Sequence, residues 1–309
     1  MTTTAHTTAT PRGAGIAPSQ RRADLVPKKR RGRASRAGSP RKNVLGGLAG
    51  YIWLAIIILP IYYVVITSFS EQGAFYTRNP LAPPANPTLD SYGLVLQSGF
   101  FTYFANSLIV TIATVIVTTI VCLLAAYVIV RSNAKFVRAT YSVFLLGLAI
   151  PLQATIVPLF FMLGQVQLYD TLWAIILPSI AFAVPITVLI LVNFLRDIPN
   201  ELFESMRVEG AGQWTILRRL VIPMARPAIA TVVIYDALQV WNGFLLPLVL
   251  TQSEDIRVLP LALWNFQGQF SINVPATLAA VVLSALPILV LYILARRQLV
   301  SGLTAGVGK

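Results

Sequence analysis

The sequence has almost no cysteine or histidine. Its 309 residues include one of each, Cys122 in an apolar run and His6 in a Thr/Ala-rich tail. A disulfide scaffold needs several cysteines, a zinc site needs a cluster of cysteine and histidine, and a Cys-His or Ser-His catalytic pair needs a histidine beside the nucleophile. The sequence therefore excludes these sites within this chain alone, and we do not expect an enzyme.

Charge is also scarce. Only 11% of the residues are charged, against about 25% in an average soluble domain, while 56% are hydrophobic and the mean hydropathy is +0.72. The charge present is unevenly placed: the formal net charge is +13, and eleven of the 24 basic residues lie in residues 1–42. This composition is too apolar for a soluble domain and indicates a membrane protein with a basic tail.

Six stretches are apolar enough to cross a membrane, which takes about 20 mostly apolar residues. They are residues 52–69, 104–130, 141–163, 173–195, 228–250 and 276–295. Each is expected to be a helix, because an open sheet in lipid would leave its backbone groups unpaired. Bends are expected where prolines fall inside them, at Pro60, Pro151, Pro158, Pro178, Pro185, Pro247 and Pro287. The predicted fold class is all-α, a polytopic membrane protein with six transmembrane helices.

Basic residues give the expected orientation, because they stay on the cytoplasmic side of a membrane. With the N-terminus inside, the inner segments hold 22 of the 24 basic residues, and only Arg78 and Arg257 lie outside. The expected topology therefore has both termini in the cytoplasm.

Residues 1–42 are rich in Thr, Ala, Arg, Gly, Ser and Pro and carry a basic cluster at 28–33. We expect this cytoplasmic tail to be disordered, because it holds too little apolar surface to fold. Setting topology is its favoured role, and binding of anionic lipid or nucleic acid is the alternative. The domain expected after it is a six-helix transmembrane domain over residues 43–309.

The outer connection between the fifth and sixth spans, residues 251–275, carries acidic, amide and tryptophan side chains. Such groups suit the hydroxyls and ring faces of sugars, although tryptophan is also common at membrane interfaces for other reasons. Two interpretations of this connection therefore stay open: it contacts a sugar, or its tryptophan only lies at the membrane interface.

The most informative connection is cytoplasmic and covers residues 196–227. Pro199 and Asn200 suit the start of a helix, and Gly210 with Gly212 suits its end. On that helix an apolar face is formed by Leu202, Phe203 and Met206, and a charged face by Glu201, Glu204 and Arg207. A short amphipathic helix of this kind suits docking into a groove of a partner protein, or lying on the membrane surface.

The same segment resembles a known family. Glu204-Ser205-Met206, followed by Gly210 and then by Leu220, Ile222 and Pro223, resembles the EAA signature of the permease subunits of bacterial ABC importers. Further matches are Asn86-Pro87-Thr88, Tyr103-Phe104-Ala105-Asn106-Ser107, Trp241-Asn242 with Phe244 and Pro247, and Gly302-Leu303-Thr304-Ala305-Gly306. Together they resemble the smaller permease of carbohydrate importers of the maltose-transporter type, over roughly residues 44–309.

The resemblance implies a type I ABC importer permease fold in the bacterial plasma membrane. It also implies an ATPase dimer, a second homologous permease, an extracellular solute-binding protein and a sugar substrate as partners. The residues that it implies for ATPase coupling are Glu201, Leu202, Phe203, Glu204, Ser205, Met206, Arg207, Glu209, Gly210, Ala211 and Pro223.

Several positions depart from the family pattern. Ser205 and Met206 replace two alanines, Glu209 replaces an aspartate, and Gly243 replaces an acidic residue after Trp-Asn. Small and apolar replacements keep docking plausible, while the bulk of Met206 leaves the identity of the matching ATPase open.

Candidate substrate contacts lie inside the spans. Asp236 is the only ionisable side chain expected there, and Gln239 and Asn242 follow it at three-residue spacing on one helix face. These groups either line a substrate path or only hydrogen-bond neighbouring helices. Gln153 and Asn193 are weaker candidates.

The sequence has no phosphate-binding loop, because Leu303 occupies the place of the first glycine before Gly308-Lys309. We therefore expect no cofactor in this chain and ATP with Mg²⁺ in the partner ATPase. The predicted function is a permease subunit of an ATP-driven sugar importer. The alternative is an ion-coupled secondary transporter, which usually has several ionisable groups and related repeats within the membrane.

Overall fold

The computed structural model describes residues 44–77, 79–266 and 272–305, and the regular structure in these ranges is helical. By its internal contacts the chain divides into two units, Met1–Ile52 and Trp53–Lys309, and this boundary falls inside the first helix, α1 (Val44–Ser68). The basic tail, residues 1–42, lies outside the described residues. The helices after α1 all belong to the second unit.

Five helical segments of the described chain are long and apolar enough to span a membrane. They are the α1 segment, α4 (Phe100–Arg131), α7 (Leu172–Arg196), the segment Gln213–Trp241 and the start of α14 (Val274–Ala305). A bent pair makes a sixth span if its two parts cross together. The described residues therefore contain the six expected spans only if this bent pair is counted as one span.

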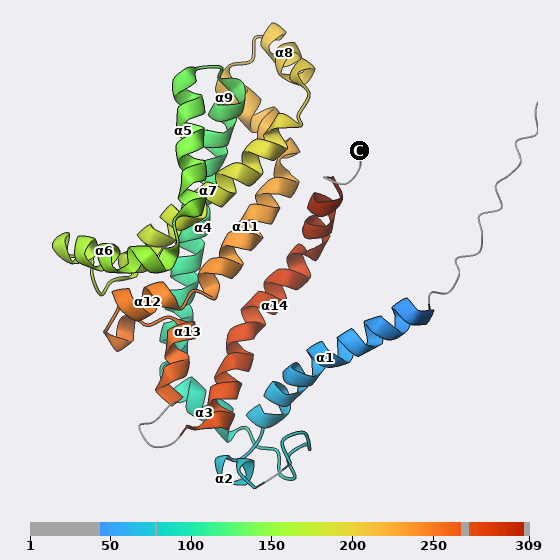
Figure 1. Ribbon diagram of the computed structural model, residues 1–309, viewed down its shortest axis with the longest axis vertical. Helices are drawn as coiled ribbons and strands as arrows, with labels where there is room; N and C mark the ends of the chain where they lie inside the picture. The colour runs from blue at the N-terminus through green and yellow to red at the C-terminus, as the bar shows by residue number, and fades with distance from the viewer. Residues whose placement is uncertain (1–43, 78, 267–271, 306–309) are drawn as a thin grey trace, which may run out of the picture. The chain divides into compact units, whose positions relative to one another are not determined.

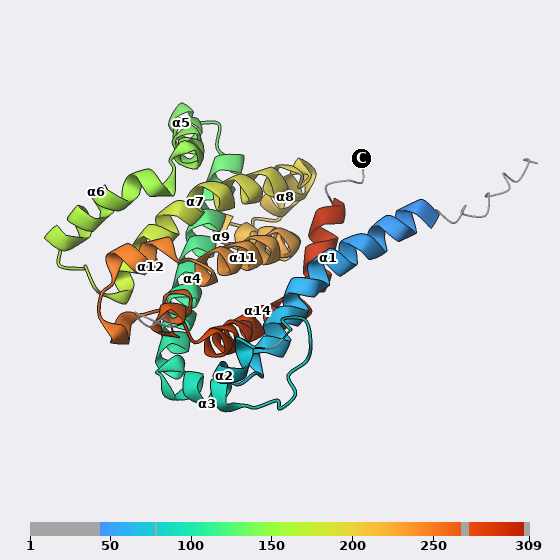
Figure 2. The same ribbon diagram turned by 60° about the horizontal axis from the view of Figure 1, so that its bottom comes forward.

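The third expected span, residues 141–163, is not one helix. It divides into α5 (Lys135–Leu146), the short turn η1 (Gly147–Ala149) and α6 (Leu152–Gln165), and the two parts meet at 103°. The chain is extended at Ile150, because the proline ring of Pro151 disfavours a helical residue before it. Figures 1 and 2 both show α6 turning away from α5.

The fifth expected span, residues 228–250, is observed as the segment Gln213–Trp241, which both begins and ends earlier in the sequence. The long segment begins earlier, with α9 (Gln213–Ile216), the wide π-type turn η2 (Leu217–Val221) and α10 (Ile222–Met224), and continues into α11 (Arg226–Trp241). It stops at Asn242, and Leu245–Leu250 form a separate helix, α12. At the break, a Cβ on Gly243 would lie 3.0 Å from the carbonyl oxygen of Val240, so a side chain is poorly tolerated there.

Helices α4, α7 and α11 pack together, and α14 packs on α11 (Figure 1). A core cluster joins α4, α7 and the segment after α7, with Leu123, Leu191, Leu195 and Val221 among its buried members. A close contact joins η1, directly after α5, to α7: a Cβ on Gly147 would lie 2.7 Å from Cγ of Pro185.

Short helices occupy the ends of this bundle. Helix α8 (Asn200–Val208) lies at one end in Figure 1, and α2 (Gln72–Phe75), α3 (Asp90–Gln97) and α13 (Leu259–Ala262) lie at the other. Single turns η3 (Glu254–Ile256) and η4 (Leu263–Phe266) flank α13. The segment predicted to face a cytoplasmic partner is therefore at the opposite end from α13.

Candidate functional site

Helix α8 begins at Asn200 and ends at Val208, which confirms both of its predicted boundaries. Its stop is a Schellman motif. The amide of Ala211 donates to the carbonyl oxygen of Met206 at 2.9 Å, the amide of Gly210 donates to that of Arg207 at 2.9 Å, and Gly210 has φ +80°. Because only glycine adopts this φ at little cost, Gly210 fixes where the helix ends and how the chain leaves it.

One side of α8 is anchored to the end of α4. The ring of Phe203 is 2% exposed, and the guanidinium carbon of Arg131 lies 4.2 Å from its centroid. Arg131 Nη1 also donates to Asn200 Oδ1 at 2.9 Å. Beyond the helix, the hydroxyl of Tyr127 donates to Gln213 Oε1 at 2.6 Å. These contacts hold the helix at a fixed orientation.

The anchored side changes the predicted docking face. Phe203 is buried in the chain's own core, and Met206 and Ala211 are half-buried and pack against that core, while Leu202 is exposed. The face that α8 and the following turn leave open is formed by Glu201, Leu202, Glu204, Ser205, Arg207, Val208, Glu209, Gly210 and Trp214. Pro223 is also exposed. Val208 and Trp214, which sequence reasoning did not select, are 89% and 64% exposed.

Asp236 lies on α11 and is fully buried. Its Oδ2 accepts a hydrogen bond from the hydroxyl of Thr187 on α7 at 2.9 Å, and its Oδ1 has no partner among the described residues. It lines a cavity of about 240 Å³ together with Tyr235, Gln239 and Ser179. A buried carboxyl with one oxygen that has no partner keeps the capacity to accept a further hydrogen bond from a hydroxyl or amide group.

The other expected substrate contacts do not all gather at this cavity. Gln239 does, but Asn242 sits at the end of α11, where its amide donates to the carbonyl oxygen of Leu238 at 2.8 Å, and it lines a separate cavity of about 250 Å³. Gln153 on α6 and Asn193 on α7 are exposed and line neither of these cavities. The three polar residues expected on one face of α11 therefore line two different cavities, Asp236 and Gln239 the first and Asn242 the second.

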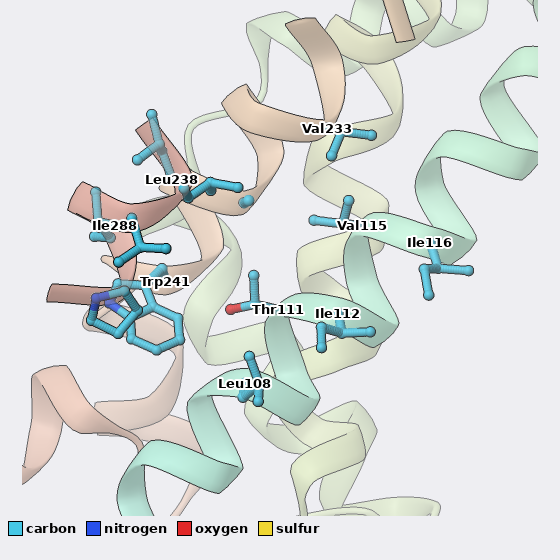
Figure 3. Close-up of a pocket in the computed structure, with 13 residues that line it drawn as sticks. Leu108, Thr111, Ile112, Val115, Ile116, Val233, Leu238, Trp241 and Ile288 are labelled. Carbon is cyan, nitrogen blue, oxygen red and sulfur yellow. The ribbon is translucent and has the colours of Figure 1, made fainter. Parts of the chain in front are cut away.

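A larger cavity, of about 380 Å³, is almost entirely apolar. Leu108, Ile112 and Val115 of α4 border it on one side in Figure 3, with Leu238 and Trp241 of α11 and Ile288 of α14 on the other. Thr111 is its one polar lining residue, and the Oγ1 of Thr111 has no partner among the described residues. This surface suits apolar protein or lipid groups.

Sequence reasoning missed Asp170, which lies between α6 and α7. One carboxylate oxygen accepts hydrogen bonds from the amides of Gln252 at 2.7 Å and Ser253 at 2.9 Å, and the other accepts from the hydroxyl of Ser253. The amide of Gln252, then the hydroxyl and amide of Ser253, hold the pKa of Asp170 below its ordinary value. No spacing in the sequence links residues more than 80 positions apart, so nothing in it pointed to this contact.

Comparison with known proteins adds the family. Residues 118–299 match the model of a family described as the binding-protein-dependent transport system inner membrane component. The chain is 34% identical over 258 residues to a putative ABC transporter permease protein, ORF2, of Caldicellulosiruptor sp., which covers 84% of this chain and 94% of that protein. It is 33% identical over 258 residues to the diacetylchitobiose uptake system permease protein NgcG of Streptomyces coelicolor, covering 82% of this chain and 85% of that protein.

Among solved structures, a bacterial ABC transporter involved in the import of the acidic polysaccharide alginate shares the fold. The TM-score is 0.72 at 20% sequence identity, over 82% of this chain and 95% of that one. At this level of identity the likeness concerns the arrangement of the helices, and it confirms the expected importer permease fold.

Proposed function

Because this chain belongs to the family of inner membrane components of binding-protein-dependent transport systems, we propose that it forms half of the membrane pathway of an ATP-driven importer of sugars or oligosaccharides. It is a multi-pass inner-membrane permease. It does not itself hydrolyse ATP in this proposal; a dimer of separate ATPase subunits binds ATP and Mg²⁺ and supplies the energy.

The observation that carries the proposal is the anchored helix α8. Its buried side, with Phe203 under Arg131, fixes it to α4, and its open side presents Leu202, Ser205 and Val208 with charged neighbours. A helix that is rigidly joined to the transmembrane core and open on its other side can transmit a displacement of a docked subunit to the spans. We therefore assign it as the contact with the ATPase.

This assignment fixes the proposed orientation. Helix α8 lies in the cytoplasm with both chain termini, as the distribution of basic residues predicts. The opposite end, with α3 and α13, then faces outside, where an external solute-binding protein delivers the sugar.

A second permease completes the pathway. The 24-residue segment Leu45–Ser68 of α1 has no buried residue within its most apolar stretch, and a cavity of about 380 Å³ between α4, α11 and α14 is lined almost entirely by apolar side chains (Figure 3). Lipid can cover such surfaces, but the proposed importer has a homologous subunit for them to pack against.

The sugar assignment rests on relatives and on the cavity at Asp236. The relatives include uptake systems named for diacetylchitobiose and for multiple sugars. The cavity presents a carboxyl, an amide and a hydroxyl from Asp236, Gln239 and Ser179, together with the ring of Tyr235. Sugar hydroxyls pair with the first three groups, and an aromatic ring covers the apolar face of a pyranose.

The test is a deletion of the gene followed by measurement of uptake of labelled neutral oligosaccharides. We expect loss of uptake of at least one oligosaccharide, restoration by the wild-type gene and no restoration by Gly210→Asp. Restoration by Gly210→Asp to the wild-type rate would contradict the role of α8.

The ion-coupled secondary transporter is the alternative, and Asp236 is the one observation in its favour. Uptake by the purified chain alone in liposomes, driven by a proton or sodium gradient and without ATP, would replace the proposal with that alternative.

A further inference from the structure

The connection after α12 is an arch, residues 251–259, that is fixed at both ends by side chains from distant parts of the sequence. It leaves α12 at Leu250 and enters α13 at Leu259. Between these points Gln252, Ser253, Glu254 and Asp255 are exposed. An exposed connection of this length usually takes many conformations, so the contacts at its ends decide its shape.

The first end is held by Asp170. The backbone amide of Asp170 donates to the carbonyl oxygen of Leu250 at 3.0 Å, and the Asp170 carboxylate accepts three hydrogen bonds from Gln252 and Ser253. Asp170 has φ +58°, a left-handed conformation that aspartate tolerates better than most residues. Asp170 lies in the short connection between α6 and α7, and this backbone conformation is part of the turn that the connection makes.

The second end is held by α4. The Asn106 amide donates to the carbonyl oxygens of Asp255 at 2.7 Å and Arg257 at 2.9 Å, and the hydroxyl of Ser107 accepts from the amide of Leu259 at 2.8 Å. The arch is therefore joined to α4 on one side and to the α6–α7 connection on the other. The backbone of the exposed residues is therefore held directly, at Gln252 and Ser253 by Asp170 and at Asp255 by Asn106.

We propose that Asp170 is a positioning residue that holds this arch in the shape to which the external solute-binding protein docks. The proposal rests on the proposed function, which places the arch on the outer side of the membrane. A loop that already has its docking shape loses little conformational entropy when the partner binds. This raises the affinity without any new contact. Asp170 therefore acts through Gln252 and Ser253 and does not itself touch the partner.

The left-handed φ of Asp170 allows a clean variant. Asp170→Gly keeps the backbone conformation, because glycine adopts positive φ freely, and removes only the carboxylate. Gln167→Gly is the matched control, because Gln167 has φ +57° in the same connection and carries no carboxylate. Asp170→Asn is the conservative variant, because asparagine also tolerates this φ and its amide oxygen can still accept from the two arch amides.

The first measurement is amide hydrogen exchange in the arch, on the full-length chain in lipid nanodiscs at neutral pH. We expect exchange at Gln252 and Ser253 to be about tenfold faster in Asp170→Gly, because both amides lose their hydrogen-bond acceptor. Wild-type rates are expected in Gln167→Gly, and nearly wild-type rates in Asp170→Asn. Unchanged exchange in Asp170→Gly overturns the proposal whether or not the chain is a transporter.

The second measurement is ATP-dependent uptake by the reconstituted importer, as a function of the concentration of the solute-binding protein that co-purifies with it. We expect Asp170→Gly to raise the half-saturating concentration about fivefold at an unchanged maximal rate, and Asp170→Asn to restore most of the affinity. A lower maximal rate at unchanged half-saturation overturns the positioning role and leaves the proposed function intact. Absence of uptake by the wild-type assembly overturns the proposed function and, with it, the docking role, whatever the exchange rates.

Discussion

Gly210 is the residue on which the end of α8 depends. Its φ of +80° costs an L-residue about 1–2 kcal/mol, although a Cβ there would meet no atom within 4 Å. We expect Gly210→Ala to weaken binding of the ATPase about fivefold or more. The measurement is the amount of ATPase retained on the immobilised chain.

Gly212 supplies the control for that variant. It lies two residues later, has φ −71° and also has nothing within 4 Å of a Cβ. Gly212→Ala is expected to retain the wild-type amount of ATPase. Equal loss in both variants would show that added bulk, and not the conformation of Gly210, is responsible.

Asp236 and Thr187 form a buried pair whose two possible roles can be separated. Thr187→Val removes the hydroxyl partner of a buried carboxyl and is expected to destabilise the chain by about 1 kcal/mol. In the double variant with Asp236→Leu both partners are apolar, so stability is expected to recover. The thermal midpoint in detergent measures this, with Thr114→Val as control because the buried Thr114 hydroxyl has no partner among the described residues.

Uptake by the same double variant then shows whether Asp236 lines the substrate path or only stabilises the packing of α11 on α7. If Asp236 lines the substrate path, the double variant is stable and transports poorly. Wild-type uptake by a stable double variant would restrict Asp236 to a packing role.

Helix α8 is the element whose position matters most. Phe203→Ala removes its buried anchor, a change that costs about 3–5 kcal/mol in a well-packed core, and also removes the partner of the Arg131 guanidinium. We expect tryptic cleavage after Arg207 to become faster. Leu202→Ala is the control, because Leu202 lies on the same helix, is 38% exposed and is remote in sequence from the cleaved bond; faster cleavage in both variants would contradict the anchoring role.

The sequence predicted some elements well and others poorly, for identifiable reasons. The bounds of α8 were predictable, because Pro199 and Gly210 act locally. The 103° bend at Pro151 and the break at Gly243 were not, because hydrophobic length cannot distinguish a straight span from two joined helices. The inward placement of Phe203 was also hidden, because an amphipathic pattern does not reveal whether its apolar face meets the same chain or a partner.

For the whole molecule, the proposed topology can be measured directly. Cys122 is fully buried and is the only cysteine, so Cys122→Ala provides a background for single-cysteine reporters. In intact spheroplasts we expect a membrane-impermeant maleimide to label Glu254→Cys in the arch and to label Val208→Cys on α8 only after permeabilisation. Labelling of Val208→Cys from outside would reverse the orientation.

In the proposed function, this chain works only as one part of an assembly driven by a separate ATPase. The most direct test is purification of the tagged wild-type chain in mild detergent, with identification of the proteins that accompany it. We expect an ATPase and a second, homologous permease to accompany the wild type, and the ATPase alone to be lost from Gly210→Asp. Recovery of the wild-type chain alone, or only with copies of itself, would show that it is not a subunit of an ATP-driven importer.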